Sequence, residues 1–333
     1  MCAVLRVAIL AVLLASLRVA QATETVTVAP RLVPGTMVSI DIERERAVEH
    51  DGQWLVEAKS RTLARLGVVA ENPHGHRLVW RIERIDPQLV PGDLPEVTRR
   101  LSTIVEGLAF VLATDAARRP LGIAERAGVR ASLRSAVARA AEAIVEDLTA
   151  RGLPAAQAQD AAERMAQPFF DLAAAPDARF DAVHLQDPAV VLDLAGRSLV
   201  VASAVTREES RVVAVLGEKA QRLLVQERAD WQQDARGERL LVVERTESLA
   251  EPIAPAEVLA RFPGLQAVIA SLDPQSREKT LEGLPPGDFV RHTVWRFDPG
   301  SWWPVGIERE ETVRLGTLAR RTLARYRLVP QRG

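Results

Sequence analysis

Alternating apolar and polar residues predict that much of this chain forms β-strands. The alternation is clear at residues 38–42 and again at residues 78–82. Because successive side chains of a strand point to opposite faces, this pattern indicates an antiparallel sheet with one apolar and one wet face. Turn-forming sequences such as Asn72-Pro73-His74-Gly75 and Asp234-Ala235-Arg236-Gly237 separate the runs.

Apolar residues spaced three or four apart predict helices elsewhere in the chain. This spacing holds from Glu125 to Ala150, with arginines and glutamates between the apolar residues, and Gly152 then supplies a stop. A second helix is expected from Pro154 to Ala166 and should end or kink near Pro168. A further helical stretch is expected near 255–285.

The strand pattern occurs twice along the chain. Four blocks match in the same order: 35–40 with 196–201, 75–79 with 237–241, 96–97 with 257–258, and 115–126 with 298–309. The offset is 161 or 162 residues for the first three blocks and 183 for the last. An insertion of about 20 residues in the second copy explains the change. Any two meanders share glycine turns and alternating valines, but the conserved order of four blocks favours an internal duplication.

These patterns predict an α+β fold in which two similar antiparallel β-meanders form a curved sheet or half-barrel packed against amphipathic helices. We expect a first β-repeat at 23–126, a helical segment at 127–185, and a second β-repeat at 186–333 with a helical insertion near 255–285. The order of strand, Asp-containing turn and Pro-x-Gly-Ile strand is similar to that in envelope carriers of lipid or lipoprotein, where a curved antiparallel sheet closes over helices. That resemblance is one of architecture, and architecture does not fix function.

The first 22 residues have the three parts of a secretory signal peptide. Arg6 precedes a mostly apolar run at 7–17, and Ala20-Gln21-Ala22 forms a small-x-small cleavage site. The run is shorter than the roughly 20 residues that a transmembrane helix needs. We therefore predict a signal peptide at 1–22 that is cut after Ala22, a periplasmic or secreted location, and no transmembrane segment in the mature chain. An uncleaved N-terminal anchor and a cytosolic chain are the alternatives.

Removal of this segment would leave a mildly acidic chain without a thiol. The segment contains Cys2, the only cysteine, together with Arg6 and Arg18, so the formal charge would change from −1 to −3. An exported chain of this kind must fold without disulfides, which its length allows because it can bury a large core. The acidic balance argues against general nucleic-acid binding. A content of only three lysines in an arginine-rich chain suggests a GC-rich bacterial genome.

The sequence contains no specific catalytic motif. It has no G-x-S-x-G elbow, H-E-x-x-H, phosphate-binding or dinucleotide-binding loop, or EF-hand. His74 and His76 could face a metal ion, but they lie at an expected hairpin tip without a third ligand nearby, so we favour a solvated turn. The acids of 43–46 and 308–311 mix with arginines and are interpreted as cross-strand pairs on the wet face. We therefore predict no catalytic residue, no metal site and no cofactor.

Tryptophans are the candidate contact residues. Trp80 and Trp295 stand in similar Val-Trp-Arg triplets and are expected to fill the core between sheet and helices. Trp302 and Trp303 are adjacent in an expected turn before Pro304, where both side chains can hardly be buried. One of these two is expected to line the rim of a pocket or to contact a partner. All four are candidates for contact with a ligand or partner.

Three functions fit these patterns. The favoured one is an exported, non-catalytic protein of the cell envelope that binds an apolar ligand, lipid or polypeptide between sheet and helices. The second is a structural or adaptor protein of the envelope with a packed core, which the lack of any pocket above roughly 300 Å³ would favour. The third is a hydrolase with a site made of scattered residues, which perturbed carboxylates converging in a cleft would favour. We expect a lipid or an envelope protein as partner; the oligomeric state is not predicted.

Overall fold

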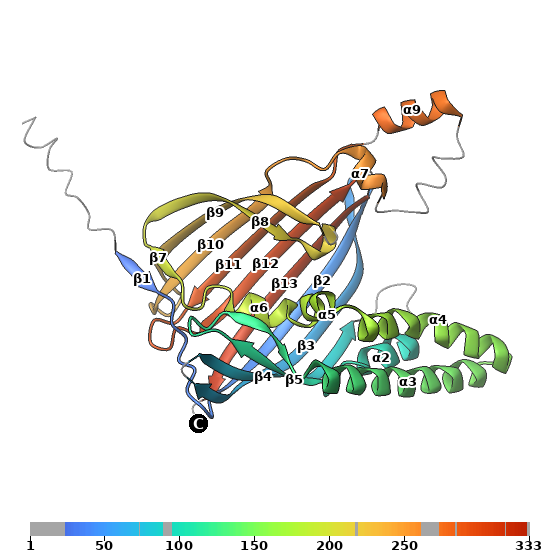
Figure 1. Cartoon of the computed structure of the whole chain (residues 1–333), viewed down its shortest axis with the longest axis horizontal. Coiled ribbons are helices and arrows are strands. Elements are labelled where there is room, and N and C mark those ends of the chain that lie inside the picture. The colour runs from blue at the N-terminus through green and yellow to red at the C-terminus, as the bar shows by residue number, and fades with distance from the viewer. Residues whose placement is uncertain are drawn as a thin grey trace, which may run out of the picture.

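A large antiparallel sheet dominates the protein. The computed structural model describes residues 24–72, 74–88, 95–216, 219–260, 273–283, 285–316 and 318–331. Eleven of the described strands form one sheet in the order β6-β5-β4-β3-β2-β13-β12-β11-β10-β9-β8, and its two edges do not join (Figure 1). The predicted α+β class, with a curved and unclosed antiparallel sheet packed against helices, is confirmed.

The first half of the sheet is built from residues 37–124. Its elements are β2 (Met37–His50), β3 (Gln53–Asn72), β4 (Gly75–Gln88), α2 (Pro95–Thr103), β5 (Ala109–Thr114) and β6 (Pro120–Ala124). Each strand pairs with the next along the chain, as the alternating pattern and the turn sequences predicted.

The second half of the sheet is built from residues 203–331. Its elements are β8 (Ser203–Val212), η1 (Ala214–Leu216), β9 (Ala220–Gln233), β10 (Arg239–Leu249), α7 (Pro255–Ala260), α9 (Pro274–Glu282), β11 (Asp288–Phe297), β12 (Pro304–Leu315) and β13 (Leu318–Gln331). Strand β13 returns to pair with β2 and so joins the two halves. Two short strands, β1 (Thr25–Thr27) and β7 (Ser198–Val200), form a separate pair.

Three of the four blocks that resemble one another in sequence occupy corresponding places in the two halves of the fold. The first pair does not, because 35–40 leads into β2 of the large sheet whereas 196–201 contains β7 of the separate two-stranded pair. The turn at Gly75 joins β3 to β4, and the turn at Gly237 joins β9 to β10. Helix α2 then precedes β5 and β6, as α7 and α9 precede β11 and β12. Both series run across the sheet in the same direction, with β13 between them. The duplication and its boundaries stay predictions, which this arrangement fits in part.

Four helices follow β6: α3 (Arg126–Ala150), α4 (Ala155–Ala174), α5 (Asp177–His184) and α6 (Gln186–Leu192). Helix α3 matches its predicted range within one residue. Helix α4 does not end near Pro168 but continues to Ala174, because its stripe of buried alanines packs along α3 and outweighs the roughly 3 kcal/mol cost of an internal proline. The helices also continue seven residues beyond residue 185, to Leu192.

The main core lies between the concave face of the sheet and helices α5 and α6. Trp80, Trp295, Ile307 and Tyr326 from four different strands all belong to it and are at most 4 % exposed. A separate apolar cluster, which includes Phe289, lies toward the end of the sheet where α7 is found. The α3–α4 hairpin extends beyond the sheet (Figure 1).

Two predicted segments lie outside the described residues. These are the signal peptide at 1–22 and the middle of the helical insertion at 261–272, which α7 and α9 flank. Within the described ranges, no helix combines the length and the apolar character needed to cross a bilayer.

Candidate functional site

A cavity of about 340 Å³ lies on the concave side of the sheet, against helices α5 and α6. Its floor comes from β10, β11 and β12, and its sides come from the two helices and from the end of β8 with the following turn. The volume falls within the roughly 300–1,000 Å³ range of small-molecule sites. A fully packed interface, as the adaptor hypothesis expects, would leave no space of this size here.

Three exposed apolar side chains are among the residues that line this cavity and form an apolar part of its rim. Val183 on α5, Val212 on β8 and Val215 in η1 are 47 %, 55 % and 40 % exposed, although large apolar side chains are usually buried. Further inside, Val190 and Trp295 are buried and line the wall. The Trp295 indole nitrogen donates a hydrogen bond to the Val190 carbonyl oxygen at 3.0 Å. This apolar rim and wall suit a hydrocarbon chain.

The floor of the cavity is a ladder of alternating charges. Arg291 on β11 stands directly opposite Glu311 on β12 and directly opposite Glu247 on β10. Its guanidinium donates to Glu311 at 2.6 Å and to Glu247 at 3.0 Å. Arg211 at the end of β8 forms a further ion pair with Glu247. Opposite charges on facing strand positions attract each other, so the ladder holds the strand register at the floor.

The inward position of these charges corrects the interpretation of the acid-rich runs. Glu308 and Glu310 are exposed on the outer face, but Arg309 and Glu311 face the concave side, where their side chains are each 17 % exposed. The prediction of cross-strand pairs is right for Glu311, whereas its placement on the wet face is wrong. The sequence does contain a signal for this placement. Alternate residues of a strand lie on the same face, so Arg309 and Glu311 share the face of buried Ile307.

A second buried cluster fastens the end of α6 to the sheet. Arg245, whose side chain is 3 % exposed, donates to Glu227 at 2.8 Å and to Asp193 at the end of α6 at 2.5 Å. Arg197 also donates to Glu227, at 3.0 Å. Burial acts to raise the pKa of Glu227, but Arg245 and Arg197 outweigh it, so this pKa lies below its ordinary value. Helix α6 is therefore held beside the cavity by paired charges.

Arg309 is the weakly paired cation of the floor. Within the described ranges its one ion pair, with Glu311, spans 3.5 Å, and the same Glu311 oxygen is already bound by Arg291. Burial lowers the pKa of Arg309, and repulsion from Arg291 lowers it further. The Arg309 side chain lines the cavity, so this incompletely compensated charge is presented to whatever enters.

The carboxylates that meet in the cavity are structural ion-pair partners. Burial acts to raise the pKa of Glu247, but Arg211 and Arg291 outweigh it and the pKa lies below its ordinary value. A general acid at neutral pH needs a raised pKa instead. Glu247 is therefore held as an ion-pair partner of the floor and lacks the raised pKa of a general acid.

The structure places the four candidate tryptophans in different surroundings. Trp295 lines the cavity, while Trp80 is buried in the core on β4. Trp303 is 1 % exposed, whereas its neighbour Trp302 is half-buried. The two adjacent side chains are thus not both fully buried, as expected from their position in a turn. The Trp302 ring lies with its centroid 6.5 Å from that of Trp231. Contact of any of these tryptophans with a ligand or partner stays a prediction.

The His74-Gly75-His76 turn is less solvated than expected. His74 is exposed, but His76 is 6 % exposed and its backbone N–H donates to the Thr114 hydroxyl at 3.0 Å. The burial arises because the turn packs tightly against the end of β5. In the described part of the chain, no group of three or more metal-binding side chains occurs.

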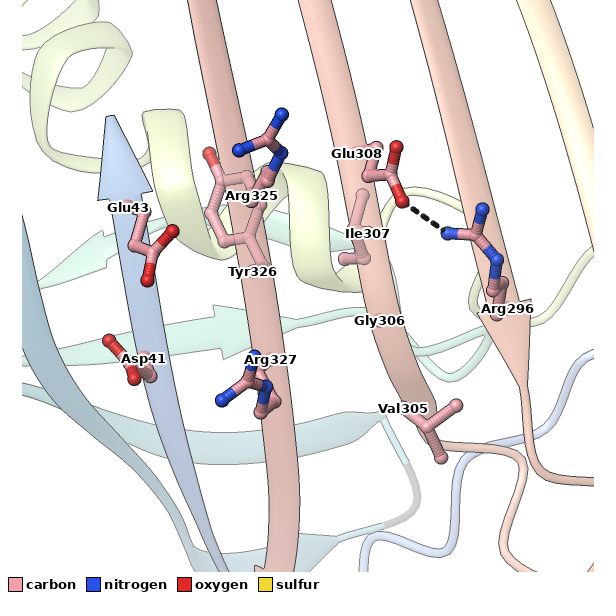
Figure 2. A pocket seen from close by; sticks show the side chains of 10 residues that line it. All are labelled: Asp41, Glu43, Arg296, Val305, Gly306, Ile307, Glu308, Arg325, Tyr326 and Arg327. Carbon is pink, nitrogen blue, oxygen red and sulfur yellow. Dashed lines mark hydrogen bonds and ion pairs between the residues drawn. The ribbon is translucent and has the colours of Figure 1, made fainter. Parts of the chain in front are cut away.

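A smaller hollow of about 200 Å³ lies on the outer face of the sheet, over Gly306 on β12 (Figure 2). Arg327 and Asp41 lie on one side of it, and Glu308 and Arg296 lie on the other, paired at 2.9 Å. A Cβ atom at Gly306 would meet only the Tyr326 carbonyl oxygen, at 3.8 Å. The hollow thus exists because Gly306 has no side chain on this charged, solvated face. The cavity on the concave side is the stronger candidate site.

Comparisons with known proteins give little further information. Neither a family model nor a curated protein matches the sequence. A structure of lipovitellin that describes its lipid–protein interactions is similar at a TM-score of 0.37 and 10 % identity, over 91 % of this chain and 26 % of that chain. An outer membrane channel from Pseudomonas putida F1 is similar at a TM-score of 0.16 and 9 % identity, over 90 % of this chain and 97 % of that chain. Both TM-scores are too low for the similarity to support an argument about ligand or function.

Proposed function

We propose that this protein is an exported, non-catalytic binding protein of the cell envelope that holds the apolar part of a lipid or similar ligand between its sheet and helices. The observation that supports this most directly is the cavity of about 340 Å³ with its exposed apolar rim. The N-terminal pattern of a signal peptide supports the proposed location.

The surroundings of the cavity are organised before a ligand arrives. Asp187 and Asp193, near the two ends of α6, bind the sheet residues Arg44 and Arg245. These bonds fix the helix at the cavity wall. The charged floor resists collapse, because inward movement of the wall would remove water from the ion pairs and disturb their bonding geometry. A preorganised site loses less conformational entropy when it binds. The cavity is therefore suited to holding a ligand rather than closing on itself.

The expected energetics follow from hydrocarbon burial. A chain that passes the rim valines and lies against Val190 and Trp295 gains about 0.8 kcal/mol for each buried methylene. That is about a fourfold gain in affinity per methylene. Affinity should rise with chain length until the cavity is full and should then level off.

Two measurements on delipidated protein test this function. Saturated alkyl ligands of increasing length, assayed by displacement of a fluorescent apolar probe, should bind more tightly with each added methylene. Native mass spectra of protein purified under mild conditions should show a bound lipid-like molecule. Delipidated protein that binds neither probe nor ligand, together with mass spectra free of lipid, would contradict the proposal and favour a structural or adaptor role.

A further inference from the structure

The cavity lining has three arginines and three carboxylates, but the larger ion-pair network to which they belong does not balance in charge. Ion pairs link six arginines in one network: Arg197, Arg207, Arg211, Arg245, Arg291 and Arg309. The same pairs involve five carboxylates: Asp193, Glu209, Glu227, Glu247 and Glu311. Among the described residues, this network on the concave side therefore has one positive charge in excess.

Arg309 is weakly paired, so the excess positive charge of this network lies at Arg309. Arg245 is bound closely by Glu227 and Asp193, and Arg291 is bound by two glutamates. Arg309, in contrast, is paired among the residues that the structure describes by one 3.5 Å contact, with a carboxylate that is already bound by Arg291. The half-buried guanidinium of Arg309 has five N–H donors, and its positive charge is not fully neutralised by a carboxylate. Binding of an anion is therefore favoured, because charge-assisted hydrogen bonds strengthen where water is excluded.

The cavity places this charge beside apolar surface. Arg309 and Thr293 stand directly opposite each other on β12 and β11, and both line the floor. The exposed valines Val183, Val212 and Val215 form the rim. One cationic position at the floor with an apolar rim matches an amphipathic molecule that has a single acidic group.

We infer that the cavity binds the acidic head group of an amphipathic ligand, a carboxylate or a phosphate, on the guanidinium of Arg309, with the hydrocarbon chain directed along the rim valines. This inference rests on the proposed function and specifies its ligand class. The Thr293 hydroxyl, on the same floor, is positioned to add a neutral hydrogen bond to the head group.

Head-group preference tests the inference separately from hydrocarbon binding. Dodecanoate, dodecyl phosphate and dodecanol have the same chain length, and their dissociation constants are measured on delipidated wild-type protein at neutral pH. Loss of a charged hydrogen bond predicts that dodecanol binds about 10- to 100-fold more weakly than the preferred anion. The tighter of the two anions identifies the head group.

Two variants locate the preference. In Arg309→Gln, the ratio of anion affinity to dodecanol affinity, both measured on this variant, should fall to about one. Arg325→Gln, on the exposed outer face of β13, should keep the wild-type preference. The wild-type comparison needs no variant, so it remains decisive if Arg309→Gln fails to fold.

The outcomes separate the inference from the function on which it rests. Equal binding of all three ligands by wild-type protein, or an unchanged preference in folded Arg309→Gln, would overturn the head-group assignment and leave hydrocarbon binding in place. Failure of all three ligands to bind would overturn the proposed function itself.

Discussion

The carboxylate of Asp187, on helix α6, lies 2.5 Å from the guanidinium of Arg44, on strand β2. The same carboxylate accepts a hydrogen bond from the hydroxyl of Tyr326, on the neighbouring strand β13, at 2.9 Å. Asp187 raises the pKa of Arg44, and burial raises the pKa of Tyr326. One carboxylate thus fastens the helix at the cavity wall to the middle of the sheet.

Removal of this carboxylate should destabilise the protein. Asp187→Ala leaves the part-buried Arg44 charge without its partner. Breaking a fully buried pair costs about 3–5 kcal/mol, and the partial exposure of these two side chains makes the expected cost smaller. The free energy of unfolding from urea titration measures the loss. The double variant Arg44→Met, Asp187→Leu removes both charges and should lose less than Asp187→Ala alone. A double variant as unstable as the single one would show that the ion pair does not explain the effect.

Acid should weaken the fold through Glu227 and Glu247. The pKa values of both residues are lowered in the folded state, because neighbouring arginines outweigh the effect of burial. As pH falls, the unfolded chain binds protons first, at about pH 4.3, so the free energy of unfolding declines from there through the lower folded-state values. The double variant Glu227→Gln, Glu247→Gln should be less stable at neutral pH and should show a flatter decline.

Urea titrations at several pH values between about 6 and 3 test this pH dependence. The exposed Glu278 on α9 offers a matched control, because Glu278→Gln should follow the wild-type curve. A double variant whose unfolding free energy declines as steeply as that of wild type would show that the acid sensitivity has another source.

Gly196 should not tolerate a side chain. Its φ is +73°, and a Cβ atom would lie 2.0 Å from the carbonyl oxygen of Ala117 in the turn between β5 and β6. The left-handed conformation alone costs about 1–2 kcal/mol for other residues, and the backbone collision adds to it. Gly196→Ala should therefore lower the thermal midpoint clearly. Gly306→Ala, where the nearest atom is 3.8 Å away, should leave it nearly unchanged, and similar effects of the two variants would contradict this account.

Export should leave a defined N-terminus. Expression in a bacterial host with a periplasm should yield protein in the periplasmic or secreted fraction that begins at Thr23, without Cys2. Intact-mass measurement of that fraction detects the cut. Full-length protein with Cys2 retained in the soluble cytosol would contradict the predicted signal peptide.

The sequence was informative where structure is determined by local periodicity. Alternation located β2 and β4, and the apolar spacing of 125–150 identified α3 almost to the residue, because both patterns report which face of one element is buried. The course of α4 through Pro168 could not be predicted, since its packing along α3 decides it. Helix α6 was also missed, because its short apolar run resembles a strand.

The candidate site was harder to predict than the fold. The cavity brings together Val183, Val212 and Arg309, which are far apart in sequence, and no local pattern encodes that meeting. The charges of β12 look like a solvated strand when taken alone. Only the change from apolar to charged residues along one strand face, from Ile307 to Arg309 and Glu311, indicated a polar floor inside the fold.

A side chain that fills the cavity should block ligand binding between sheet and helices. Ala189, exposed on α6, lines the cavity, whereas Ala178, exposed on α5, does not line it. Dodecanoate affinity is measured for wild type, Ala189→Trp and Ala178→Trp by displacement of an apolar fluorescent probe. Ala189→Trp is expected to lose at least about tenfold in affinity, whereas the equally bulky Ala178→Trp should bind as wild type does. Unchanged dodecanoate binding by folded Ala189→Trp would contradict ligand binding between sheet and helices.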